Sequence, residues 1–139
     1  LPLQQVVSGG ELSRIMLAIK TLLADKDQTE TLIFDEIDAG ISGRTAQKVA
    51  EKMRVIGESH QILCITHLPQ IASQADYHYL IEKNVENMET TTRIRRLSYE
   101  ESVEELARML GGAKITQAVL ENAGEMKDLA QQQKNTRLK

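Results

Sequence analysis

The sequence has few aromatic residues, a single cysteine and no long apolar runs. Aromatic side chains make up 3% of the 139 residues and hydrophobic residues 41%, so the core of the fold must be aliphatic. One cysteine, Cys64, excludes a disulfide within the chain, which fits a reducing, cytosolic environment. No run approaches the roughly 18 apolar residues of a membrane helix, so no membrane partner is expected.

Neither sign of charge dominates the composition. Lys and Arg number 17 and Asp and Glu 20, a net charge of −3, which argues against a dedicated nucleic-acid-binding module. The length fits one domain. The chain has no visible signal peptide and opens with Leu1 rather than Met, so we expect a fragment of a longer protein.

The sequence also lacks GxxxxGK[ST], the usual loop that holds nucleotide phosphates. It nevertheless contains Ser8-Gly9-Gly10-Glu11, followed at once by a helical pattern. Two glycines allow close approach of an anion, and a helix N-terminus offers unpaired N–H groups. Ser8 and Glu11 also form a capping box that would serve a helix with no ligand. This stretch alone supports both interpretations.

Hydrophobic periodicity predicts an α/β fold. A helix should run from Ser8 to near Asp25. Buried strands are expected at residues 31–36 and 61–65, separated by an amphipathic helix that stops near Gly57. Strand, helix and strand in this order predict a βαβ unit with parallel strands.

The pattern changes after residue 72. Alternating residues at 77–82 and 91–97 predict an antiparallel hairpin with its turn near Asn87. A helix capped by Ser98 and Glu101 should follow and end at Gly111 and Gly112. A last helix is expected from 116 to 132, followed by a polar tail that frays.

Acidic side chains end the first predicted strand, and a histidine follows the second. Asp35 and Glu36 lie where ligands of α/β sheets bind. Because neighbouring side chains on a strand point opposite ways, Asp35 can hold Mg²⁺ while Glu36 faces an attacking water as general base. His67 should emerge at the same edge, where it can contact a terminal phosphate. Solvated acids and a backbone-bonded loop histidine remain the alternative interpretations.

Three stretches together resemble the ATP-binding-cassette ATPases: "VVSGGELSRIMLAIK", "LIFDEIDAGISG" and "ITHLPQIA". The similarity is to the SMC-like branch with long coiled coils and, within it, to the C-terminal ATPase segment of the RecN family of bacterial DNA repair proteins. It runs from about Val6 to Gly112. It implies the C-terminal lobe of a P-loop NTPase head, with residues 1–112 as head and 113–139 as C-terminal helix and tail.

The resemblance implies a role for each motif residue. Ser8, Gly9, Gly10 and Glu11 would form the signature motif, which binds the γ-phosphate of ATP held by the opposite protomer. The second set would consist of the Walker B magnesium ligand, the catalytic base and the switch histidine, namely Asp35, Glu36 and His67. Residues 39–43 would cross the dimer interface, with Ser42 where many relatives have aspartate.

The resemblance also implies missing parts. In such proteins the Walker A loop lies in the N-terminal half, and its strand lies beside the counterpart of residues 61–65. We therefore expect a bare edge on that strand and an inactive isolated chain. The whole protein would be an ATPase with ATP and Mg²⁺, acting as a homodimer of heads on DNA in double-strand break repair and recombination, in the cytoplasm at the nucleoid.

Two other classes of function are open. A non-catalytic dimerisation module of the same head would have no need of an acid at Glu36. A stand-alone Mg²⁺-dependent phosphohydrolase using Asp35, Glu36 and Asp38 would not explain why SGGE precedes a helix. Solvated charge is the simpler interpretation of the candidate DNA contacts, which are Arg93, Arg95, Arg96, Lys134, Arg137 and Lys139.

Overall fold

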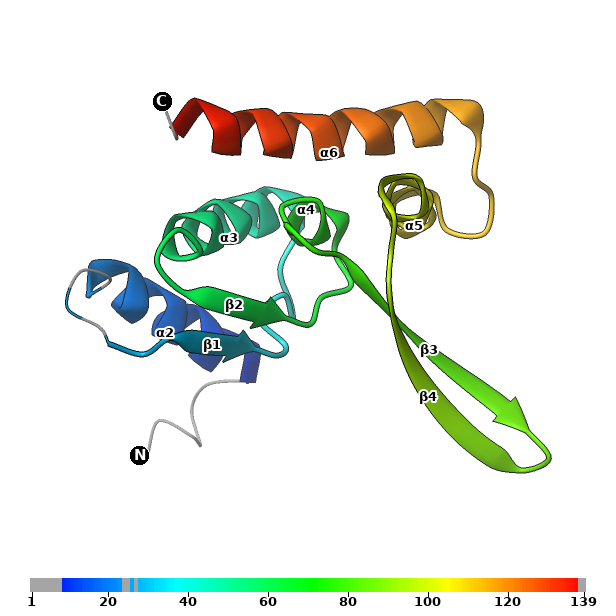
Figure 1. The fold of residues 1–139 in the computed structure, drawn as a ribbon, viewed down its shortest axis with the longest axis horizontal. Helices are drawn as coiled ribbons and strands as arrows, with labels where there is room; N and C mark the ends of the chain where they lie inside the picture. Colours follow the sequence, from blue (N-terminus) through cyan, green and yellow to red (C-terminus); the bar gives the residue numbers. More distant parts are fainter. Residues whose placement is uncertain (1–8, 24–25, 27, 138–139) are drawn as a thin grey trace. The chain divides into compact units, whose positions relative to one another are not determined.

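The structure, a computed structural model, describes residues 9–23, 26 and 28–137 (Figure 1). The chain divides into two compact units, Leu1–Ile71 and Ala72–Lys139. The first unit contains α2 (Gly9–Leu22), β1 (Thr31–Phe34), α3 (Gly43–Ile56) and β2 (Gln61–Cys64), and the short α4 (Pro69–Ala72) follows. The second contains β3 (Tyr79–Glu86), β4 (Glu89–Arg96), α5 (Tyr99–Gly111) and α6 (Gln117–Arg137). The functional boundary expected at residue 112 stays a prediction.

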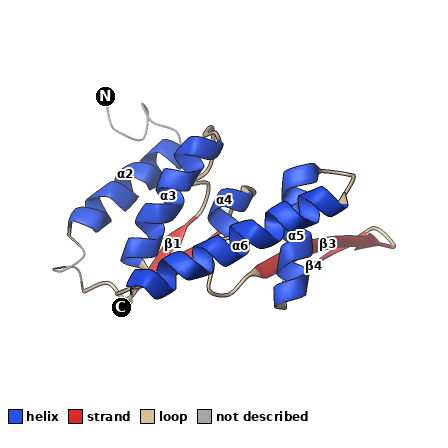
Figure 2. Ribbon diagram, turned by 90° about the horizontal axis from the view of Figure 1, so that it is seen from above, coloured by secondary structure: helices blue, strands red, loops and turns tan. Residues whose placement is uncertain are grey.

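The first unit is a parallel βαβ arrangement, as the sequence predicts. β1 and β2 pair in parallel, with Thr31 opposite Gln61 and Phe34 opposite Cys64. Their connection is α3, which ends at Gly57 as expected. α3 lies over the two strands and α2 packs against α3 (Figures 1 and 2). The predicted α/β fold class is therefore confirmed.

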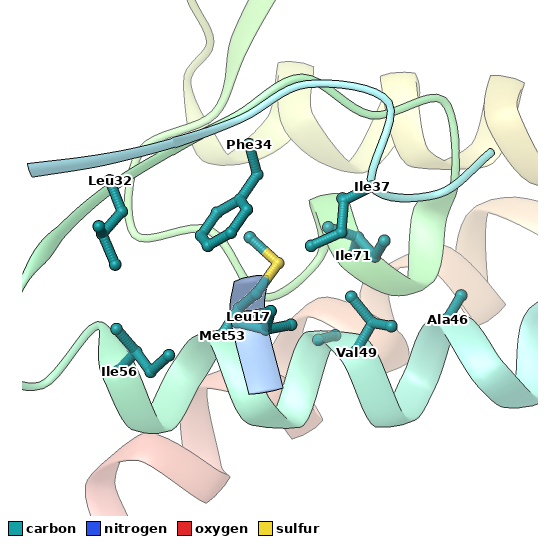
Figure 3. Packing of buried hydrophobic residues seen from close by; sticks show 10 residues of the cluster. Leu17, Leu32, Phe34, Ile37, Ala46, Val49, Met53, Ile56 and Ile71 are labelled. Atoms are coloured by element: carbon teal, nitrogen blue, oxygen red, sulfur yellow. The ribbon is translucent and has the colours of Figure 1, made fainter. Parts of the chain in front are cut away.

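The core of this unit lies between α3 and one face of the strands. Leu32 and Phe34 of β1 point toward Met53 and Ile56 of α3 (Figure 3). The core is aliphatic apart from one phenylalanine, and its other buried members are Leu17, Ile37, Ala46, Val49, Ala50 and Ile71. Fully burying a side chain such as that of Ile56 contributes roughly 1.5–3 kcal/mol.

The opposite face of β1 and β2 is apolar and exposed. Ile33 is 70% exposed, Leu63 49% and Ile65 51%. Ile33 lies opposite Leu63 in the register, so these side chains form one patch. The sequence predicted buried strands, and among the described residues this prediction holds for one face of β1 and β2 only. Within the described part of the chain, one layer of helices covers the strands. It buries Leu32 and Phe34 but leaves the side chains at the alternate strand positions exposed.

The second unit contains the predicted hairpin. β3 and β4 pair from Tyr79 opposite Arg96 to Glu86 opposite Glu89, and Asn87 and Met88 form the turn. The strands extend closer to the turn than residues 77–82 and 91–97 would. The hairpin forms its own sheet, separate from β1 and β2.

The helices of the second unit confirm one prediction and correct another. Ser98 caps α5 in a complete capping box with Glu101, as expected. The polar tail was expected to fray after residue 132, but α6 continues to Arg137. Lys134 stabilises this extension because its Nζ lies 2.5 Å from the carbonyl oxygen of Gln74 and 2.8 Å from Asp76 Oδ1. No described helix is long and apolar enough to cross a bilayer.

Candidate functional site

The carboxyl ends of β1 and β2 bring the predicted acids and histidine to one edge of the sheet. The Ile65 amide donates to the carbonyl of Phe34 at 3.0 Å, so the two strands remain paired as they end. Beyond this point, Asp38 Oδ2 lies 2.8 Å from His67 Nδ1. The expectation that His67 emerges beside the acidic loop is thus confirmed.

Asp38 is the buried carboxylate of this loop. It is 4% exposed, and its Oδ2 accepts hydrogen bonds from Thr66 Oγ1 at 2.5 Å and from the His67 amide at 2.8 Å. Burial by itself raises the pKa of Asp38, but the Thr66 and His67 hydrogen bonds and the charge of His67 outweigh it, and the pKa is lowered. Asp38 is therefore ionised at neutral pH.

Asp35 and Glu36, in contrast, are exposed. Glu36 has a φ of 61°, a left-handed backbone conformation that a side chain with a Cβ rarely adopts. Such a conformation costs on the order of 1–3 kcal/mol and persists only where neighbouring contacts enforce it. The backbone of Glu36 is therefore held in place by its surroundings.

Helix α2 supplies the contacts that hold this turn. Ser13 Oγ donates to the carbonyl of Asp35 at 3.1 Å. Arg14 Nη1 donates to the carbonyls of Ile37 at 3.0 Å and Ala39 at 2.9 Å. Together these bonds fix the backbone on both sides of Glu36. Sequence reasoning missed Ser13 and Arg14, although both are polar residues in the first turns of an otherwise apolar helix.

The first residues of α2 lie directly against Glu36. A Cβ on Gly9 would lie 2.6 Å from Glu36 Oε2. A Cβ on Gly10 would lie 2.7 Å from the Glu36 carbonyl oxygen and 2.8 Å from Ala39 Cβ. Close packing thus requires Gly10 even without a ligand. Ser8 lies outside the described residues, so its capping and phosphate-binding roles stay predictions, as does the role of the exposed Glu11.

The acidic loop does not form a complete metal cage. Among the described residues, no three His, Cys, Asp or Glu side chains are grouped to hold a metal ion. Asp38 is already bonded to Thr66 and His67, which weakens the interpretation as a stand-alone phosphohydrolase. Asp35 on its own still suits Mg²⁺, which proteins commonly hold through one or two carboxylates with waters and substrate phosphates.

Three of the basic residues considered for DNA, Arg95, Arg96 and Lys134, have structural partners in the second unit. Arg95 pairs with Glu101, and the Arg96 guanidinium lies 4.4 Å from the centre of the Tyr77 ring. Lys134 is anchored to Asp76, and Lys139 lies outside the described residues. These contacts favour a structural role for Arg95, Arg96 and Lys134 over a role in DNA binding.

The chain is similar over most of its length to a segment of several curated DNA repair proteins. It is 50% identical over 129 residues to DNA repair protein RecN of Halalkalibacterium halodurans, covering 93% of this chain and 23% of that protein. It is 46% identical over 134 residues to RecN of Bacillus subtilis, covering 96% of this chain and 23% of that protein. It is 47% identical over 125 residues to RecN of Deinococcus radiodurans, covering 90% of this chain and 22% of that protein. The chain thus spans less than a quarter of the length of these relatives.

Comparison with solved structures supports the same fold. The chain matches one from work on the structural biochemistry of ATP-driven dimerization and DNA-stimulated activation of SMC ATPases, with a TM-score of 0.55 and 21% identity, covering 79% of this chain and 66% of the other. No protein-family model matches. The resemblance inferred from the motifs is confirmed: the chain is related to a segment of the DNA repair protein RecN and shares its fold with an SMC ATPase.

Proposed function

We propose that this chain is the C-terminal lobe of an SMC-like ATPase head that acts in DNA double-strand break repair and recombination, in the cytoplasm at the nucleoid. The observation that carries the proposal is that Asp35, Glu36 and His67 follow the carboxyl ends of the paired strands β1 and β2, with the glycine-rich start of α2 against Glu36. The similarity to RecN over most of the chain supports it.

These three residues would divide the chemistry of ATP hydrolysis. Asp35 would hold Mg²⁺, which supplies positive charge at the phosphates when bound. Glu36 accepts the proton of the attacking water, and its fixed backbone keeps the carboxylate in one region. His67 is exposed beyond Asp38, where it can bond the terminal phosphate or the water.

The start of α2 serves the nucleotide of a second head. Gly9 is exposed, and the first turn of a helix offers unpaired N–H groups and a positive dipole end. With Ser8 and Glu11 these residues would bind the γ-phosphate of ATP held by the partner protomer. A homodimer of heads therefore has two composite sites, and DNA is bound through the full-length protein.

The uncovered face of the sheet fits a missing N-terminal half. Ile33, Leu63 and Ile65 form an apolar patch, and among the described strands β2 pairs with β1 alone. Neither hairpin strand pairs with β2, because β3 and β4 form a separate sheet. Since the RecN relatives are about four times as long, the N-terminal half carrying Walker A is the partner that we propose for this face.

A non-catalytic dimerisation module is the second candidate function. It would use the same start of α2 but would not need an acid in a strained conformation. The left-handed backbone of Glu36, held by Ser13 and Arg14, therefore favours the catalytic proposal.

Substitution of Glu36 tests the proposal in a head reconstituted with the N-terminal half. Glu36→Gln should retain ATP binding but slow hydrolysis by roughly two to four decades, because the amide cannot accept the proton. Steady-state ATP turnover and nucleotide binding are measured together. Glu121→Gln, an exposed site on α6, is the matched control. Turnover by Glu36→Gln at the wild-type rate would show that Glu36 is not the base.

A further inference from the structure

Asp38 differs from the other two acids of its loop in burial and in bonding. Its side chain is 5% exposed, whereas that of His67 is 72% exposed. Two donors, Thr66 Oγ1 and the His67 amide, hydrogen-bond to its oxygen Oδ2, and His67 Nδ1 lies 2.8 Å from the same oxygen as an ion pair. A buried carboxylate bonded in this way is directed at the histidine and away from solvent, so it is poorly placed to meet a substrate.

We propose that Asp38 is the positioning residue of His67, which it locks in the Nδ1–H tautomer with Nε2 turned outward. The part of the inference that concerns a terminal phosphate or water at Nε2 rests on the proposed ATPase function. The positioning itself does not, because it follows from contacts within this chain.

The tautomer follows from the chemistry of the partner. An ionised carboxylate only accepts hydrogen bonds, and at a separation of 2.8 Å an unprotonated Nδ1 would set its lone pair against that oxygen, so the contact favours a proton on Nδ1. When the ring is neutral, Nε2 is then a hydrogen-bond acceptor. When the ring is protonated, Nε2 becomes a donor, and the negative charge of the Asp38 carboxylate compensates the positive charge of the ring. The partner of one ring nitrogen thus decides what the other nitrogen can do.

The geometry also fixes the orientation of the ring. The His67 amide and its Nδ1 both reach Asp38 Oδ2, so backbone and side chain of one residue are tied to one atom. Thr66 Oγ1 accepts from the Leu68 amide at 3.1 Å, which leaves its own proton for Asp38. These bonds restrict rotation of an otherwise exposed side chain.

Nitrogen-15 NMR of the histidine rings tests the positioning on this chain. The wild-type spectrum should show His67 with a protonated Nδ1 and an unprotonated Nε2. Asp38→Ala removes the acceptor and should replace this pattern by averaged shifts or by the Nε2–H pattern. Asp35→Ala removes one negative charge from the same loop without touching His67, so it should leave the tautomer unchanged. His78, whose Nδ1 lies 2.7 Å from Ser102 Oγ in the other unit, is an internal reference.

Each outcome bears on the inference. A wild-type His67 in the Nε2–H form, or an unchanged tautomer in Asp38→Ala, would overturn it, and the wild-type result holds even if the variant does not fold. In the reconstituted head, Asp38→Ala should lower kcat by about ten- to a hundredfold with little change in KM, the range known for partners that orient metal-binding histidines, which act on the ring in the same way. If Asp38→Ala loses the tautomer but keeps the wild-type kcat, the contact of His67 Nε2 with phosphate or water is overturned and the positioning stands. The proposed ATPase function is tested separately, and wild-type turnover by Glu36→Gln is the result that would contradict it.

Discussion

At the scale of single residues, Gly9 and Gly10 meet the same loop with different consequences. A Cβ at position 10 would meet backbone, the Glu36 carbonyl oxygen at 2.7 Å, as well as Ala39 Cβ at 2.8 Å. A Cβ at position 9 would meet only the end of the flexible Glu36 side chain, at 2.6 Å. The two glycines are therefore not equivalent in packing.

We expect Gly10→Ala to lower the free energy of unfolding by about 1–3 kcal/mol, because the loop must shift to accept the methyl group. Gly9→Ala should change it by less than about 0.5 kcal/mol, since the carboxylate can rotate away. Urea unfolding of the two variants and the wild type measures both. Equal stability of the two variants would contradict the close packing at Gly10.

Cys64 is a half-buried thiol with low reactivity. Burial, followed by the charges of Asp38 and Asp35, raises its pKa from 9.0 to about 12. Because only the thiolate reacts, and a pKa rise of three units leaves roughly a thousandth of the thiolate at pH 8, alkylation of folded protein should be slow. Mass spectrometry after treatment with iodoacetamide, with and without urea, measures the ratio of the alkylation rates of unfolded and folded protein. Rapid labelling of folded protein would show that Cys64 is accessible and ionisable.

At the scale of elements, the β3–β4 turn contains an avoidable strain. Met88 has a φ of 65° and a fully exposed side chain. Its left-handed backbone conformation therefore destabilises the fold, and no packing of the side chain offsets this cost. Asn87, with a φ of 51°, is a residue type that tolerates the left-handed region better, because a short polar side chain can hydrogen-bond to the nearby backbone. The sequence Asn-Gly is the common solution for such a two-residue turn.

Met88→Gly should therefore stabilise the hairpin by about 0.5–1 kcal/mol, since relief of the left-handed Cβ exceeds the added freedom of the unfolded chain. Hydrogen exchange of the hairpin amides should slow accordingly. Glu89→Gly, at the next position within β4, is the control and should speed exchange, because glycine weakens a strand. Faster exchange in Met88→Gly would mean that the turn is not strained as described.

At the scale of the whole molecule, the described edge offers acids and a histidine to a nucleotide but no phosphate-binding lysine loop. We expect the chain alone to bind Mg-ATP only in the millimolar range, about −4 kcal/mol. Isothermal calorimetry with the wild type and Asp35→Asn measures this, and any weak magnesium-dependent heat should vanish in the variant. Micromolar affinity would place the main phosphate site within this chain, contrary to the proposal.

The sequence by itself determined the elements, their order and the motif residues. Apolar spacing located α3, α5 and the two parallel strands, and the Ser98–Glu101 pair predicted the start of α5. These signals are local, because capping and periodicity involve residues within a few positions of one another. The same locality explains the error in α6, whose end depends on Lys134 reaching Gln74.

Only the tertiary structure decided which side chains meet. Asp38 lies 28 and 29 positions from its partners Thr66 and His67, and Arg14 lies 23 and 25 positions from the carbonyls that it holds. No spacing rule connects such positions, because their distance depends on how the βαβ unit closes and how α2 packs against α3. For the same reason the exposure of Ile33 was not predictable: alternation identifies the two faces of a strand, but the number of covering layers is a property of the folded molecule.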